Sequence, residues 1–78
     1  MTPAQCRAAR GLIDWSQVKL AEVAAVAVST VTSFERSSRV ATPERIQAMR
    51  AALERAGVEF INGDEPGVKL RKPGISGW

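Results

Sequence analysis

The spacing of apolar residues predicts that the chain begins with a helix. Thr2, Pro3 and Gln5 form a helix start, because threonine can cap the first turn, proline lacks an amide hydrogen that this turn would leave unpaired, and glutamine can complete a capping box. We expect the helix to begin at Pro3 and to end soon after Gly11, which weakens it. Its inward stripe at helical spacing consists of Cys6, Ala9 or Arg10, and Ile13.

Two short helices are predicted next. Ser16 is a good cap for a helix over residues 17–24. The inward positions of this helix are Leu20, Ala21 and Ala24. The pattern then breaks and resumes over residues 28–36, where Val31 and Phe34 keep helical spacing. The valine, serine and threonine content of this second segment favours a strand on intrinsic propensity alone, so periodicity and propensity disagree there.

A fourth helix is predicted over residues 43–56. Thr42 and Pro43 repeat the cap and proline that begin the first helix, and Gly57 is placed to end the helix in a left-handed conformation. The apolar positions recur at steps of three and four, at Ile46, Met49, Leu53 and Ala56.

The C-terminal part of the chain predicts a small hairpin. The turn-rich sequence NGDEPG separates an apolar segment, residues 58–61, from an alternating one, residues 68–70. An isolated hairpin is marginal in water, so this one must pack on the helices or pair with another chain. The 78 residues suffice for one small domain. We divide it into a helical core at 1–57, a hairpin at 58–72 and a loose tail at 73–78 that ends in Trp78.

Composition and charge narrow the classes of function. Eleven Lys and Arg against eight Asp and Glu give a net charge of +3 and a pI near 9.8, which is compatible with a polyanionic partner. The basic charge is local, because Arg36, Arg39, Arg45 and Arg50 lie in one middle segment. With no histidine and a single cysteine, we expect no disulfide, no metal site, no cofactor and no enzymatic activity.

We expect a cytoplasmic protein with no membrane partner. The first ten residues, MTPAQCRAAR, lack the apolar core of a signal peptide, and the run rich in valine and alanine at 23–28 is too short to span a bilayer. Cys6 lies on the inward stripe of the first helix, which favours a buried apolar side chain over a redox site.

Five short runs stand in an order and spacing that resemble a known family. They are Ser16-Gln17, Leu20-Ala21, Ala24-Ala25-Val26, Ser29-Thr30-Val31 and Phe34-Glu35-Arg36. Over about residues 6–53 the chain is similar to regulators of the Cro and lambda-repressor type, the Xre family. Two helices joined by a tight turn need a small residue such as Ala21 where they touch. The resemblance implies a mainly all-α, four- to five-helix lambda-repressor-like DNA-binding domain with a short C-terminal β-hairpin or strand.

The resemblance also implies roles for individual residues. The residues expected to contact DNA base edges are Ala27, Val28, Ser29, Thr32 and Ser33. Val28 can pack on a thymine methyl. Contact with DNA phosphates falls to Gln17, Arg36, Ser38 and Arg39. Arg10 and Glu35 match a structural pair that joins the first helix to the end of the third. The alternative for the hydroxyl and arginine side chains is an ordinary solvated surface.

Three positions depart from the family pattern. Ala25 stands where relatives usually carry glycine, and a left-handed alanine there costs about 1 kcal/mol. Ala27 replaces the usual cap of the third helix, at a cost of about 1 kcal/mol. Val28 stands where relatives often carry a long polar side chain that contacts bases.

From these features we expect a sequence-specific transcriptional regulator, a repressor, that binds double-stranded DNA as a homodimer. The operator would be near-palindromic, with the two recognition helices about 34 Å apart. The expected dimer interface is the hairpin, through Phe60, Ile61, Val68 and Leu70. The poor base-contacting face also fits a degenerate helix-turn-helix that binds a regulatory protein partner, as an antiactivator or antitoxin-like module.

Overall fold

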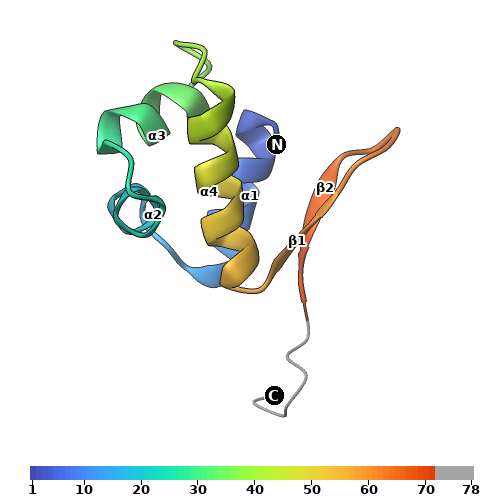
Figure 1. Cartoon of the computed structure of the whole chain (residues 1–78). Coiled ribbons are helices and arrows are strands. Elements are labelled where there is room, and N and C mark those ends of the chain that lie inside the picture. Colours follow the sequence, from blue (N-terminus) through green and yellow to red (C-terminus); the bar gives the residue numbers. More distant parts are fainter. Residues whose placement is uncertain (72–78) are drawn as a thin grey trace.

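The computed structural model describes residues 1–71, which form four helices followed by one hairpin (Figure 1). The helices are α1 (Pro3–Ile13), α2 (Gln17–Ala24), α3 (Val28–Glu35) and α4 (Pro43–Arg55). The strands are β1 (Val58–Ile61) and β2 (Gly67–Leu70). The predicted fold class, mainly α with a short C-terminal hairpin, is confirmed. Position 72 and the predicted tail at 73–78 lie outside the described residues.

Side-chain caps begin three of these four helices, at the residues that the sequence indicates. At the start of α1, the hydroxyl of Thr2 accepts a hydrogen bond from the amide of Gln5, and the side-chain oxygen of Gln5 accepts one from the amide of Thr2. Ser16 and Thr42 cap α2 and α4 through their hydroxyls. Helix α3 differs, because its N-cap Ala27 makes no side-chain hydrogen bond.

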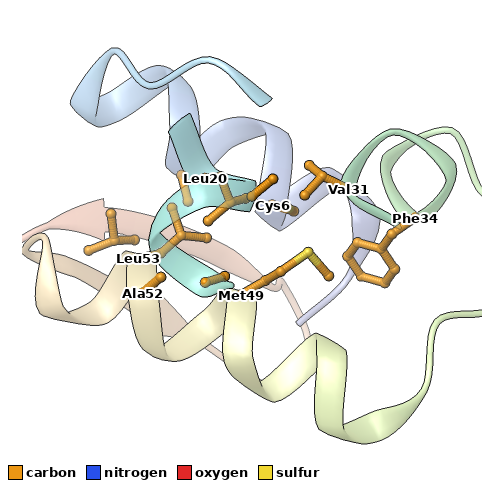
Figure 2. Close-up of a cluster of buried hydrophobic side chains, with 11 residues drawn as sticks. Cys6, Leu20, Val31, Phe34, Met49, Ala52 and Leu53 are labelled. Atoms are coloured by element: carbon orange, nitrogen blue, oxygen red, sulfur yellow. The ribbon is translucent and has the colours of Figure 1, made fainter. Parts of the chain in front are cut away.

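The core is a contiguous cluster of small and medium apolar side chains that all four helices share. Figure 2 shows Leu20 and Leu53 among them, with Met49 close by and Phe34 at one side. The buried members are Cys6, Ala9, Leu20, Ala21, Ala24, Val31, Phe34, Met49, Ala52, Leu53 and Val58. Val58 continues this cluster into the hairpin, so helices and hairpin have one common core.

Helix α3 forms although its sequence, VSTVTSFE, has poor helix propensity. The helical spacing turns Val31 and Phe34 inward, and both are buried. Burying two such side chains stabilises the fold by about 3–5 kcal/mol. This gain offsets the propensity cost of the helix, which is a few tenths of a kcal/mol for each of its eight residues. Periodicity therefore predicts α3 correctly and propensity does not.

The hairpin packs on α1 and α4, on the side of the molecule away from α2 and α3 (Figure 1). β1 and β2 are antiparallel, with Phe60 opposite Val68. The buried side-chain amide of Gln5 donates to the carbonyl oxygens of Ile61, at 3.1 Å, and Gly67, at 2.9 Å, and so ties the hairpin to α1. Gly57, at φ 106°, makes the turn from α4 into β1 in a conformation that favours glycine.

Candidate nucleic-acid interface

Helices α2 and α3 are joined by a three-residue turn, residues 25–27. Ala25 is left-handed, at φ 59°, and the amide of Val26 bonds to the carbonyl of Ala21, at 3.0 Å, which closes the end of α2. Ala21 is buried, so α2 carries at this position the small side chain that a close approach of two helices needs. The structure therefore has two short helices in the order and spacing of a helix-turn-helix, with α3 on the outside (Figure 1).

The residues expected to contact bases do not all lie free on α3. Ala27, Val28 and Ser29 are exposed, and the side chain of Val28 is 41% exposed at the first position of the helix. Ser33 is half-buried one turn further on. Thr32 is also half-buried, and its hydroxyl donates to a neighbouring side chain. The N-terminal half of α3 is thus the part that faces outward.

The side chain of Gln17 is turned toward α3. Its oxygen accepts the hydroxyl hydrogen of Thr32, at 2.9 Å, and its amide donates to Glu35 Oε1, at 3.0 Å. Both polar ends of this side chain therefore have partners within the protein. If Gln17 contacts a phosphate, its backbone amide, at the first position of α2, would make most of that contact.

Glu35 is the meeting point of α1, α2 and α3. Arg10 binds its carboxylate with two hydrogen bonds of 2.7 Å, Cys6 donates to it at 3.1 Å, and Arg7 donates to its backbone carbonyl. A further bond from Arg10 to the carbonyl of Trp15, at 3.0 Å, holds the segment between α1 and α2. These contacts fix the end of α3 and leave its beginning outward.

Burial and hydrogen bonding set the ionisation of this network. Burial acts to raise the pKa of Glu35, but the hydrogen bonds from Arg10, Cys6 and Gln17, together with the charge of Arg10, outweigh it and leave the pKa lowered. The hydrogen bond to Glu35 raises the pKa of Arg10. Burial, followed by the contact with Glu35, raises the pKa of the Cys6 thiol. The structure therefore pairs an anionic Glu35 with a cationic Arg10 and keeps Cys6 protonated.

Exposed basic side chains follow the C-terminal end of α3. Arg36, Ser38 and Arg39 are exposed, and the hydroxyl of Ser38 donates to the carbonyl of Ser33, at 3.3 Å. Ser37 turns the chain at φ 56°. A hollow of about 620 Å³ lies between α3 and the start of α4. It is lined by Ala27, Ser29, Thr30, Ser33, Arg39, Val40, Ala41 and Arg45.

Arg45 is a member of this surface to which the sequence analysis assigned no role. It lies at the third position of α4, the helix that Thr42 caps. In the sequence, Arg45 is marked only by its place in the first turn of the helix that Thr42 and Pro43 begin. Its position in the same hollow as Arg39 depends on the loop before α4. Arg50 belongs elsewhere, because it pairs with Glu54 at 3.1 Å and lies over the ring of Phe60.

Among residues 1–71, no helix is both long and apolar enough to cross a membrane. Within the same residues, no group of three or more His, Cys, Asp or Glu side chains is placed to hold a metal ion.

Comparison with known proteins agrees with this geometry. No curated protein matches the chain. A family model described as Helix-turn-helix matches residues 7–60, which is more than half of the chain and includes all of α2, α3 and α4. The chain therefore belongs to the helix-turn-helix family of DNA-binding regulators of the Xre and lambda-repressor type.

Proposed function

We propose that the protein is a transcriptional repressor that places the N-terminal half of α3 in the major groove of an operator. The observation that carries this proposal is the outward position of Val28 and Ser29 beside the arginine-bordered hollow, with the far end of α3 fixed by Glu35. A helix held rigidly at one end and exposed at the other suits insertion into a groove.

The proposal gives the basic side chains the role of binding phosphates. Arg36, Ser38 and Arg39 follow α3 directly, and Arg45 lies across the hollow from it. Exposed guanidinium groups beside a recognition helix can reach the phosphates that border a major groove. Each arginine that neutralises one phosphate should add about one unit to the salt slope of binding.

The test is selection of duplexes from a random library by the full chain, followed by mobility shift at two salt concentrations. We expect one enriched sequence that binds more tightly than its scrambled counterpart, with affinity that falls as salt rises. Arg39→Ala should weaken binding to both duplexes and flatten the salt slope. Arg55→Ala, an exposed arginine at the other end of α4, serves as the matched control and should change neither. Failure to enrich any sequence would contradict the proposal.

We propose further that the protein binds a near-palindromic operator as a homodimer joined through the hairpin. Among residues 1–71, each strand of the two-stranded sheet has one neighbouring strand, so each also has an edge that pairs with no strand of this part of the chain. Ile61 is 41% exposed, whereas Phe60 and Val68 pack against the helical core of their own chain. Support for an interface therefore comes from the strand edges and Ile61 more than from Phe60, Val68 and Leu70, which are half-buried.

Sedimentation measures whether the chain is a dimer, and it can be applied to variants at two residues of equal exposure. Ile61→Glu places a charge on the hairpin, and Leu12→Glu places one on α1, where Leu12 is also 41% exposed. We expect the wild type and Leu12→Glu to sediment as dimers and Ile61→Glu as a monomer with weaker operator binding. A wild-type chain that stays monomeric when bound to its selected duplex would contradict the dimer.

A protein-binding module is the second candidate function, because the outward surface also carries apolar side chains. Val40 is 98% exposed and lines the same hollow as Ala27 and Ser29. Exposed apolar residues next to each other are typical of a surface that binds another protein. This function predicts weak, unselective DNA binding, and a protein partner whose binding Val40→Asp abolishes.

A further inference from the structure

The outward part of α3 offers DNA an unusual set of side chains. Its sequence, VSTVTSFE, contains no asparagine, glutamine, lysine or arginine, the residues that make bidentate bonds to bases. Glu35, its one charged residue, is 3% exposed and bound to Arg10. Direct discrimination between bases by the side chains of α3 must therefore come from hydroxyl groups or from apolar contact.

The hydroxyl groups are fewer than the sequence implies. Thr32 donates its hydrogen to Gln17, and the amide of Gln17 is in turn held by Glu35. Thr32 therefore acts as a positioning residue between α2 and α3. Ser29, Thr30 and Ser33 remain, and a serine or threonine hydroxyl both donates and accepts, so it distinguishes base edges poorly.

The apolar candidate is Val28, which is 41% exposed at the first position of α3. Its neighbours in the sequence, Ala27 and Ser29, have short side chains and are exposed as well. In the major groove the C5-methyl group of thymine is the apolar feature of the base edges. Contact between a valine and this methyl removes both from water.

We infer that Val28 contributes to the sequence specificity of this protein by packing on a C5-methyl group of a pyrimidine in the major groove. The inference rests on the proposed binding of DNA through α3. It predicts that the chain distinguishes thymine from uracil, which lacks this methyl, and 5-methylcytosine from cytosine. From the burial of one methyl group we expect a difference of about fourfold in affinity in each comparison.

The test uses the full chain and the duplex that it selects from a random library. Each thymine in turn is replaced by deoxyuridine, which keeps the base pair and removes only the methyl. We expect one thymine in each half-site at which the replacement weakens binding about fourfold. With cytosine at that position, 5-methylation should strengthen binding by the same factor.

Two variants assign the effect to Val28. Val28→Ala should bind the thymine and deoxyuridine duplexes equally, whereas Leu12→Ala, at a residue that is equally 41% exposed but on α1, should keep the wild-type ratio. Selective binding with equal affinity for both duplexes at every position, or a ratio that survives Val28→Ala, would overturn the inference and leave the proposed function standing. If no sequence is selected at all, the proposed function fails and this inference fails with it.

Discussion

The hydroxyl of Thr32 on α3 donates a hydrogen bond to the side-chain oxygen of Gln17 on α2, at 2.9 Å. The side-chain amide of Gln17 donates a hydrogen bond to Glu35, and Glu35 accepts another from Arg10 on α1. This series of hydrogen bonds joins the three helices. It fixes the angle at which α3 leaves the core, which is the geometry that a recognition helix requires.

Removing the charge of Glu35 should destabilise the protein strongly. Glu35→Gln leaves Arg10 without its carboxylate in a partly buried place, and we expect a loss of about 2–3 kcal/mol of unfolding free energy. Glu54→Gln removes the exposed partner of Arg50 and should cost less than about 0.5 kcal/mol. Urea unfolding measures both. Equal losses in the two variants would show that the network around Glu35 stabilises the fold no more than the Arg50–Glu54 pair does.

Stability should fall at acidic pH because of the same carboxylate. The folded state lowers the pKa of Glu35, so its contribution is complete above the ordinary pKa and is lost as the pH falls through the lower value in the folded state. We expect the free energy of unfolding to decline below about pH 5, and to decline less in Glu35→Gln. Urea titrations across this range give the comparison, and parallel curves for the two proteins would contradict it.

Ala25 is a place where one substitution should stabilise the protein. Its φ of 59° is left-handed, a conformation that glycine adopts without the steric cost of a Cβ. We expect Ala25→Gly to raise the free energy of unfolding by about 0.5–1 kcal/mol. Ala8→Gly, at an exposed position within α1, should lower it by about 1 kcal/mol. Thermal unfolding measures the stability of both variants. A lower stability in both would mean that the left-handed turn carries no strain.

Much of the fold follows from short-range signals that the sequence carries. The capping box of Thr2 and Gln5 and the hydroxyl cap at Thr42 depend on residues three apart, so their positions are visible in the sequence. Helix α3 needed the spacing of Val31 and Phe34, because local propensity opposed it.

The site was less predictable because its contacts join distant segments. The inward turn of Gln17 depends on how closely Thr32 and Glu35 approach it, which no local pattern gives. The second role of Gln5, at the hairpin 56 residues away, has the same origin. Arg45 contributes to the hollow only because the loop before α4 brings it beside α3.

The side-chain amide of Gln5 should hold the hairpin against α1. Gln5→Glu keeps the oxygen of the capping box but removes the donor to the carbonyls of Ile61 and Gly67. We expect a loss of about 1–3 kcal/mol, because two carbonyl groups are left facing a carboxylate. Hydrogen exchange of the amides in β1 and β2 should become faster while exchange in α2 and α3 changes less. Uniform acceleration along the chain would contradict a local role.

The central claim is that the outward end of α3 and its arginine-bordered hollow bind DNA. The direct measurement is a residue-resolved NMR titration of the ¹⁵N-labelled full chain with its selected duplex and with a scrambled one. We predict that the selected duplex shifts the amides of Val28, Ser29, Arg39 and Arg45 most, and that the scrambled duplex shifts mainly those of the arginines. Shifts confined to the hairpin, or none in α3 with either duplex, would contradict the claim.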